Sequence, residues 1–332
     1  MKISIIGAGA FGTAMAIAAG RGDNEVLLWA HDPEVASTIA ETGSNPDYLP
    51  GMPLGPRVRA TNDLAEAATF SDTLFMVVPS HHYRTVLTEI REQIAGPVKI
   101  ISGTKGIENE SLERMSEVSA HVLGEQLAAF AVLSGPTFAL ETARADPTAA
   151  VIASKDTEFA QQVQQVMSSP AFRLYHSSDV VGVELAGSLK NVIAIAAGVL
   201  EGMGLGSNTT AALITRGLHE MTRLGLTLGG KLETFAGLAG MGDLVLTCTG
   251  ALSRNRTVGV LLGKGQTLDE ILRDAKFVAE GIKTSKSARQ LSERHGIEMP
   301  IASEMYRVLY EGDSPRGGLQ RLMTRSLKAE VA

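Results

Sequence analysis

The chain has 332 residues, more than the roughly 100 to 200 of a typical domain, so two domains are expected. Hydrophobic residues make up 44% and charged residues 20%, which excludes an intrinsically disordered or fibrous protein. The formal net charge of −6 argues against a nucleic-acid-binding surface, which usually needs a basic face, although a local basic pocket is still possible.

The single cysteine, Cys248, allows neither an intrachain disulfide nor a cysteine-based metal cluster, as is usual in a reducing compartment. No signal peptide pattern precedes the first strand-like run, Lys2–Ile6. The longest apolar helical stretch, Asn191–Leu200, is shorter than the roughly 18 residues of a membrane span. We therefore expect a cytoplasmic protein that does not cross a bilayer.

Short β-branched runs alternate with amphipathic segments up to about residue 178, a pattern typical of a parallel sheet covered by helices. Helix 34–41 is predicted from the Asp32-Pro33 start, and 45–56 is predicted to be a loop because it holds four prolines and two glycines. The predicted strands are Lys2–Ile6, Glu25–Trp29, Thr73–Val78, Val98–Ser102, Ala131–Leu133 and Ala149–Ala153, with Arg57–Ala60 and Phe172–Tyr175 as weaker candidates.

Helical patterns dominate after this point, and a domain boundary is predicted near residue 180. The predicted helices are Asp179–Leu200, Thr209–Leu226, Arg254–Leu262, Lys283–Arg294 and Ile301–Tyr310. The fold class is therefore an N-terminal α/β domain of Rossmann type with a mainly parallel, doubly wound sheet, followed by an all-α domain. We expect the first, over residues 1–178, to bind NAD(P), and the second, over 179–332, to bind substrate and carry the catalytic groups.

A dinucleotide fingerprint, Gly7-Ala8-Gly9-Ala10-Phe11-Gly12, follows the first strand directly and leads into a run of small residues that is predicted to be helical. Its three glycines permit a tight turn, the approach of a pyrophosphate, and close packing of helix on strand. The helix N-terminus offers free N–H groups to the phosphates. A chance glycine-rich turn is the alternative, and the strand-to-helix context makes it the weaker one.

The second strand ends in Trp29-Ala30-His31-Asp32, where NAD-specific proteins carry an acid for the ribose hydroxyls. An imidazole at His31 accepts a 2′-phosphate better than a carboxylate does, which favours tolerance of NADP. The alternative, a solvated His31 beside an Asp32 that only caps a helix, has equal weight.

Two lysines lie in unusual places. Lys105 follows the strand 98–102 at the edge where open α/β sheets bind ligands, although an exposed loop lysine is the alternative. Lys190 lies on a helix face of small apolar residues, where burial would lower its pKa and make it a candidate proton donor or acceptor. Its alternative is a lysine whose amine reaches water from a core helix.

An acid and an arginine complete the candidate site. Asp243 lies between a glycine turn and an apolar run, so it needs a cationic partner, and a lysine ammonium is the obvious one. Ser253-Arg254-Asn255 opens a helix, where free N–H groups and a guanidinium make an anion site unless the segment is simply a capped surface helix.

These motifs together resemble the NAD(P)-dependent glycerol-3-phosphate dehydrogenase family, in the family's order and with spacing closest to its bacterial members. The departures are Ala10 where many members have Ser, Met241 where Leu is frequent, and His31 where several carry Arg. The matching segments are 7–12, 103–106, 134–139, 184–191, 242–244, 253–255 and 278–281.

The resemblance implies reversible reduction of dihydroxyacetone phosphate to sn-glycerol 3-phosphate with NADPH or NADH, feeding glycerophospholipid synthesis, and a homodimer. It makes Lys190 the general acid/base, Lys105 a substrate contact beside the nicotinamide, and Asp243 the group that positions the lysine and the substrate. Gly135, Thr137, Ser253, Arg254 and Asn255 would complete the substrate site, the last three at the phosphate. The cofactor would be bordered by Gly7, Gly9, Ala10, Phe11, Gly12, His31, Lys105, Ala139, Arg254, Val278 and Glu280.

Two other functions are considered. One is another small-acid reductase with a helical C-terminal domain, of the β-hydroxyacid or ketopantoate type. The other is a sensor or scaffold that binds NAD(P) without turnover, against which Lys190, Asp243 and Arg254 argue. Cys248 is predicted to be a buried structural thiol. His81 and His82 are expected at a helix start as surface residues, not as a metal site.

Overall fold

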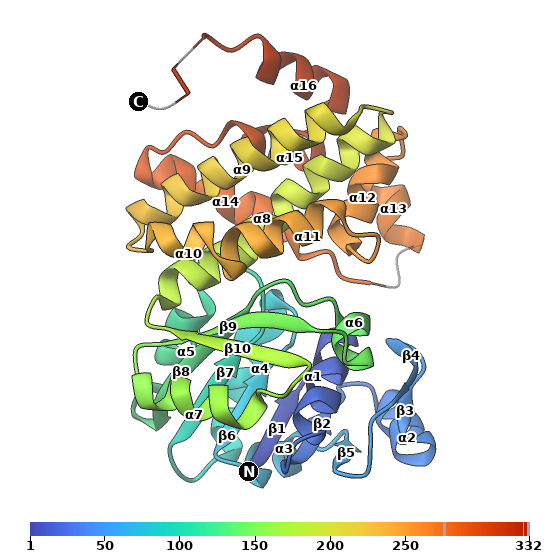
Figure 1. The fold of residues 1–332 in the computed structure, drawn as a ribbon, viewed down its shortest axis with the longest axis vertical. Coiled ribbons are helices and arrows are strands. Elements are labelled where there is room, and N and C mark those ends of the chain that lie inside the picture. The colour runs from blue at the N-terminus through green and yellow to red at the C-terminus, as the bar shows by residue number, and fades with distance from the viewer. Residues whose placement is uncertain (275–276, 328, 331–332) are drawn as a thin grey trace.

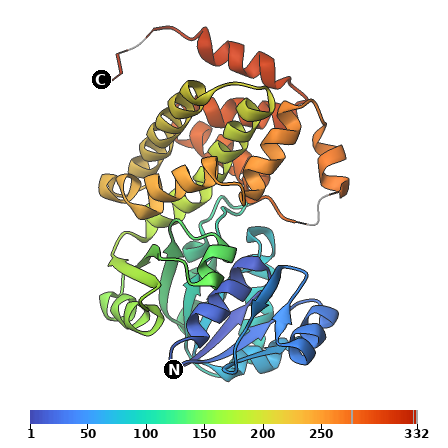
Figure 2. The same ribbon diagram turned by 45° about the vertical axis from the view of Figure 1, so that its right-hand side comes forward.

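The computed structural model describes residues 1–274, 277–327, 329 and 330. It has two halves stacked along the long axis, and both views keep them apart (Figure 1 and Figure 2). The sheet half, from the N-terminus through strand β10, contains the eight-stranded sheet, and the helical half, from helix α8 onward, lies above it in Figure 1. The Rossmann-type sheet followed by a helical domain, predicted from the sequence, is confirmed.

The large sheet has the strand order β10-β9-β8-β7-β6-β1-β2-β5. All its pairs are parallel except β8–β9, so β9 and β10 run against the other six strands. Each of the eight predicted strands exists, the two weaker candidates included. The bounds are β1 Lys2–Ile6, β2 Glu25–Trp29, β5 Val58–Thr61, β6 Thr73–Met76, β7 Val98–Ser102, β8 Leu127–Ser134, β9 Thr148–Ser154 and β10 Phe172–Ser177.

The helices of the sheet half pack their apolar sides on both faces of the sheet. Three of them start at an aspartate whose side chain accepts first-turn N–H groups: Asp32, Asp63 and Asp156. The bounds are α1 Ala10–Gly20, α2 Pro33–Thr42, α3 Leu64–Phe70, α4 Ser80–Gln93, α5 Met115–Leu123, α6 Ala139–Arg144 and α7 Thr157–Met167, with a 3₁₀ turn, η1, over Gly124–Gln126.

The helical half is built around α8, Val180–Gly202, which most of the other helices of this half contact. The five predicted helices are confirmed, each one to three residues longer at one or both ends. The other bounds are α9 Ser207–Thr227, α10 Leu232–Ala236, the π-helical turn η2 Leu238–Gly242, α11 Asp243–Thr249, α12 Arg254–Gly263, α13 Leu268–Asp274, α14 Glu280–His295, α15 Pro300–Tyr310 and α16 Pro315–Met323.

Helix α8 is long and apolar enough to cross a membrane by length and composition, and 94% of its most apolar window is buried inside the protein. The expectation that no segment reaches the length of a span is therefore wrong on length. The apolar residues of α8 are accounted for by its place at the centre of a helical core, and among the described residues no other helix passes the same test.

Helices α8 and α12 touch backbone to backbone. A Cβ at Gly198 or Gly202 of α8 would collide with the carbonyl oxygen of Arg256 or Val260 of α12. Glycines on α12 meet α8 in the same way, so the two helices approach more closely than side chains would allow. This packing places the start of α12 beside the middle of α8, which brings the Ser253-Arg254-Asn255 segment to the level of Lys190.

The expected loop over 45–56 is wrong in part. All but its last three residues belong to an antiparallel hairpin of β3, Ser44–Asn45, and β4, Leu49–Pro53, with an irregular register. The Asn45 amide donates to the carbonyl oxygen of Ala8 and the hydroxyl of Thr13, both at 2.8 Å. This tertiary anchor in the glycine-rich turn holds a proline-rich segment that local propensity assigns to no regular element.

Candidate active site

A cleft of about 1190 Å³ separates the two halves. On one side it is lined by the residues that follow β1, β2, β6 and β7, whose carboxyl ends meet at one edge because these strands are parallel. On the other side it is lined by residues of α8, α11 and α12 and by the segment that leads into α14. The predicted site residues come together here: of those proposed from the sequence, only Gly135 does not line the cleft.

The glycine-rich turn has the geometry that a dinucleotide needs. Gly7 has φ +121, which L side chains rarely adopt, and a Cβ at Gly12 would collide with the carbonyl oxygen of Gly7. A Cβ at Gly9 would meet nothing within 4 Å, so the space above the turn is open. Helix α1 has neither an acid in its first turn nor a side-chain cap, which leaves N–H groups available to a phosphate. The residues present therefore fit a dinucleotide pyrophosphate.

His31 follows β2 on the cleft wall, exposed, with its ring 5.8 Å from that of Trp29 in an edge-on arrangement. Asp32 beside it caps α2, accepting from the N–H of Glu34 at 2.9 Å. Asp32 therefore has the structural role that the sequence allowed, and His31 is left facing the cleft.

Asp243 lies between the two candidate lysines. Its Oδ2 accepts from Lys105 Nζ at 2.7 Å, and its Oδ1 accepts from Lys190 Nζ. Lys190 and Asp243 are 4% and 1% exposed, so their charges are almost fully removed from water. The prediction that Asp243 needs a lysine partner is confirmed, and two lysines meet it.

Electrostatics in this group follow from burial. Burial lowers the pKa of Lys190 to about 7, with the Lys105 charge acting in the same direction and Asp243 against it. Burial opposes ionisation of Asp243, but the two lysine charges outweigh it and hold the pKa of Asp243 below its usual range. A carboxylate shared by two ammonium groups leaves one positive charge in excess whenever all three are ionised.

Arg254 opens α12 and lines the cleft, and within the described residues no hydrogen bond or ion pair engages its guanidinium. Burial lowers its pKa, and only Tyr48 opposes this. Its neighbours are used by the fold: Ser253 Oγ caps α12 by accepting from the N–H of Arg256, and Asn255 donates to Asn191 Oδ1 at 3.0 Å. A partly buried cation with no anion beside it is suited to binding an anionic ligand.

The remaining predicted residues have mixed positions. Thr137 is buried in the cleft wall and donates to the carbonyl oxygen of Gly135, which also accepts from Lys105 Nζ at 3.5 Å. The Lys105 ammonium lies over the ring of Phe11, with Nζ 5.8 Å from the ring centroid. Ala139, at the start of α6, and the exposed Val278 line the cleft.

Glu280 also borders the cleft, but its carboxylate is engaged. It accepts from the N–H of Ser80 at 2.9 Å and from the Ser80 hydroxyl at 2.6 Å, and so caps α4 from across the cleft. Burial raises its pKa, which Ser80 and Lys283 oppose.

Sequence reasoning missed Thr247 and Tyr48. Thr247 Oγ1 accepts from Lys190 Nζ at 2.7 Å and donates to the carbonyl oxygen of Asp243 at 2.6 Å. Its spacing of four residues from Asp243 is the signal that could have found it, had the segment been predicted as the helix α11. Tyr48, from the β3–β4 hairpin, lines the cleft on the side of Arg254 and has no comparable sequence signal.

The positions expected for Cys248, His81 and His82 are confirmed. Cys248 is buried, and burial raises the pKa of its thiol to about 12, so it is not a nucleophile. His81 and His82 lie exposed at the start of α4, and among the described residues no group of three metal-binding side chains exists.

Both halves of the chain match known proteins. The family model described as the NAD-dependent glycerol-3-phosphate dehydrogenase N-terminus matches residues 2–160, and that of its C-terminus matches residues 179–320. A glycerol-3-phosphate dehydrogenase (NAD(P)+) of Geobacter sulfurreducens is 51% identical over 99% of this chain and 98% of its own length.

The fold is also similar to that of solved structures. A glycerol-3-phosphate dehydrogenase of Coxiella burnetii has a TM-score of 0.94 at 40% identity, covering 98% of this chain and 99% of that one. A ketopantoate reductase of Ralstonia eutropha, from one of the alternative enzyme classes, reaches a TM-score of 0.60 at 18% identity over 96% of this chain and 100% of its own, a likeness of fold alone. The chain belongs to the family of NAD(P)-dependent glycerol-3-phosphate dehydrogenases.

Proposed function

We propose that Lys190 is the proton donor in the reaction of this family, the reversible reduction of dihydroxyacetone phosphate to sn-glycerol 3-phosphate. The chain is an NAD(P)-dependent oxidoreductase, and the observation that carries the residue assignment is the buried Lys105–Asp243–Lys190 group in the cleft. A lysine whose pKa is lowered towards neutrality can both donate a proton to an alkoxide and take one from an alcohol.

The nicotinamide cofactor, when bound along the turn 7–12, supplies the hydride that the carbonyl carbon accepts. We assign the stabilisation of charge and the transfer of the proton to side chains of the protein. The Lys190 and Lys105 ammonium groups would stabilise the negative charge that develops on the carbonyl oxygen, and Lys190 would then give up its proton. Asp243 and Thr247 hold Lys190 Nζ in place for this transfer.

At the other end of the substrate, we assign the phosphate to the start of α12. Three features converge there: the free Arg254 guanidinium, the positive end of the helix dipole, and first-turn N–H groups. Thr137 would form the wall between phosphate and carbonyl, and Gly135 would support it by accepting the hydrogen bond of the Thr137 hydroxyl. In this reading residues 1–178 bind the dinucleotide and residues 179–332 bring the catalytic and phosphate-binding groups to it.

The role of Lys190 predicts opposite pH dependences for the two directions. Reduction needs the ammonium, so its rate should be level at low pH and fall as pH rises through the lowered pKa. The rate of glycerol 3-phosphate oxidation depends on the free amine and should rise over the same pH range.

The same role predicts the effect of removing the amine. Lys190→Ala should lose roughly a hundred- to ten-thousand-fold in kcat with cofactor affinity nearly intact. Near-normal turnover of Lys190→Ala would remove this lysine from the mechanism.

The role of Arg254 predicts a loss specific to the phosphate. Arg254→Ala should raise KM for dihydroxyacetone phosphate roughly tenfold to a hundredfold, because a hydrogen bond to a charged group contributes about 1.5 to 3 kcal/mol. The kcat should fall too, because binding energy at the phosphate orients the carbonyl. Arg254→Lys should rescue only partly, since a point charge cannot make the bidentate contact.

Two controls accompany this experiment. Arg256, two residues later, pairs with Glu201 at 2.5 Å, so Arg256→Ala should leave KM for dihydroxyacetone phosphate close to that of the unmodified protein. Reduction of unphosphorylated dihydroxyacetone should be poor and should barely respond to Arg254→Ala. An equal loss for both substrates would show that Arg254 serves the cofactor or the fold.

The cofactor preference is predicted from His31. Because Asp32, the acid at the end of β2, already accepts from the first turn of α2, and His31 lies beside it on the cleft wall, NADPH should be used at least as well as NADH. His31→Asp would place a negative charge against the 2′-phosphate and should shift the kcat/KM ratio towards NADH by about tenfold. If the unmodified protein uses NADH far better than NADPH, the assignment of His31 fails.

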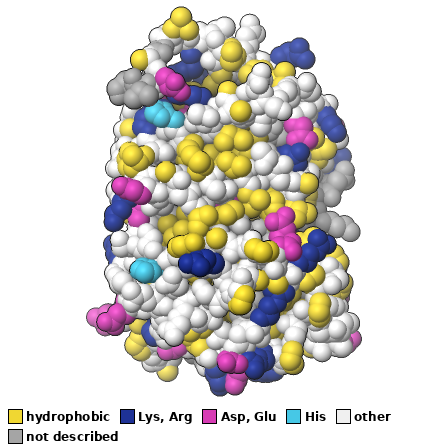
Figure 3. Space-filling view, viewed as in Figure 1, with side chains coloured by type: hydrophobic (Ala, Val, Ile, Leu, Met, Phe, Trp, Pro, Cys, Tyr) yellow, Lys and Arg dark blue, Asp and Glu magenta, His cyan; other side chains and the backbone are white. Residues whose placement is uncertain are grey.

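We also infer a homodimer. Apolar side chains gather on the face over α9 to α11 (Figure 3), where Leu226, Leu232, Met241 and Val245 are exposed. Such a face suits a second copy of the chain. Sedimentation velocity at micromolar concentration should give twice the chain mass of 35.0 kDa, and a monomer alone would contradict the inference.

We also infer a cytoplasmic location, which the single buried cysteine supports. Fractionation of the source cells would test it.

A further inference from the structure

Glu184 is a buried carboxylate on α8 that the reaction itself does not use. It is 6% exposed, and its Oε2 pairs with the Arg114 guanidinium at 2.7 Å. Its Oε1 accepts from the N–H of Ser116 at 2.7 Å, and its Oε2 from the Ser116 hydroxyl at 2.6 Å. Glu184 therefore joins α8, in the helical half, to the start of α5 in the sheet half.

Helix α8 and the loop that leads into α5 also approach each other in the active site. Lys190 lies six residues after Glu184 on α8, about 9 Å further along the helix at 1.5 Å per residue. Lys105 lies in the loop 103–114, which follows β7 and ends at Arg114. The helix and the loop are thus tied at two points, by Arg114–Glu184 and by Lys105–Asp243–Lys190.

Hydrogen bonds and ion pairs hold the loop between the two ties. The N–H of Glu108 donates to the carbonyl oxygen of Glu113 at 3.0 Å, which closes the loop on itself. Arg84 of α4 pairs with both of these glutamates, at 2.7 and 2.8 Å. Thr104, next to Lys105, donates to the carbonyl oxygen of Val78 at 2.8 Å.

We propose that Glu184 is a positioning residue for proton transfer: by holding Arg114 and Ser116 it sets the register between Lys105 and Lys190, which share Asp243. This rests on the proposed role of Lys190. The charged and polar groups that face Lys190 are Asp243, Lys105 and Thr247, with the neutral Cys248 thiol beside them. Loss of register would weaken the contact of Asp243 with the Lys190 ammonium.

The test is Glu184→Gln, which keeps the size of the side chain and can still accept from the N–H of Ser116. We expect kcat for reduction to fall, on the order of tenfold to a hundredfold for a misplacement near 1 Å, with KM for NADPH unchanged. The alkaline fall in rate should move to lower pH, because a weaker Asp243 contact and an unneutralised Arg114 both lower the pKa of Lys190 further.

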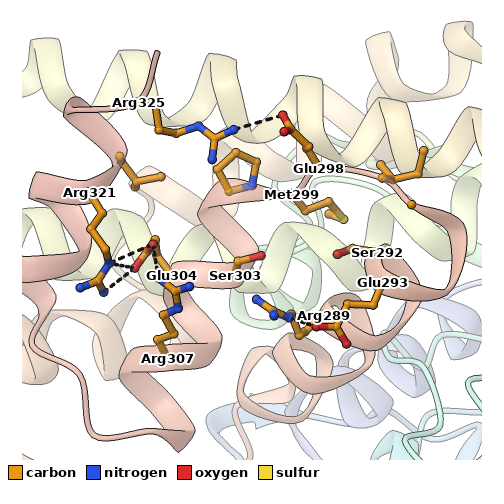
Figure 4. A pocket seen from close by; sticks show the side chains of 14 residues that line it. Arg289, Ser292, Glu293, Glu298, Met299, Ser303, Glu304, Arg307, Arg321 and Arg325 are labelled. Carbon is orange, nitrogen blue, oxygen red and sulfur yellow. Dashed lines mark hydrogen bonds and ion pairs between the residues drawn. The ribbon is translucent and has the colours of Figure 1, made fainter.

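Glu304→Gln is the matched control. Glu304 is 7% exposed and pairs with Arg321 at 2.6 Å and with Arg307, in a separate cavity of about 510 Å³ among α14, α15 and α16 (Figure 4). It should lower the unfolding temperature as Glu184→Gln does, and leave kcat and the pH profile unchanged. If Glu184→Gln also changes only the unfolding temperature, the inference is overturned.

Arg114→Lys serves as the second variant should Glu184→Gln fail to fold, because it keeps the charge and loses the fork that reaches Glu184 and Glu117 together. It should shift the pH profile in the same direction by a smaller amount, and an unchanged profile in the folded variant would overturn the inference. If the alkaline fall persists in Lys190→Ala, the proposed function fails instead, so the two failures are distinguishable.

Discussion

The structure depends on one buried carboxylate, Asp243, that pairs with two lysine ammonium groups. Asp243 is nearly inaccessible to water, and a charge in that position is tolerable only with partners in hydrogen-bond contact. Because Lys105 comes from the sheet half and Lys190 from the helical half, this requirement draws the two halves together in the cleft. It also leaves an excess positive charge in the cleft of a chain whose net charge is −6, and this charge would stabilise the alkoxide in the reaction that we propose.

Two of the contacts between the halves away from Asp243 repeat one arrangement. Glu184 and Glu280, both from the helical half, each take the N–H and the hydroxyl of a serine in the first turn of a helix in the sheet half. Helix α4 has no side-chain cap of its own, so without Glu280 its N-terminal N–H groups would lack this acceptor. The halves are therefore joined by hydrogen bonds that each half needs, which makes their relative placement specific.

Much of this could be predicted from the sequence because the relevant signals are local. The strand that precedes Gly7 and the helix that follows Gly12 define the cofactor turn, and the small residues around Lys190 indicate a buried helix face. The β3–β4 hairpin could not be predicted, since the Asn45 contacts that anchor it lie more than 30 residues away in the chain. The capping role of Glu280 was missed for the same reason, because only the fold brings Ser80 near it. Thr247 was missed because 243–249 was not predicted to be a helix, which places Thr247 one turn after Asp243 and beside Lys190.

The two arginines at the start of α12 show what the fold adds to a motif. Arg256 lies two residues after Arg254, in the first turn of the same helix. Arg256 pairs with Glu201 of α8, so its charge is already used within the protein. Arg254 has lost part of its hydration and has gained no carboxylate among the described residues. A phosphate bound there would replace missing solvation rather than compete with an existing ion pair, and this is why we assign the substrate phosphate to Arg254 and not to its neighbour.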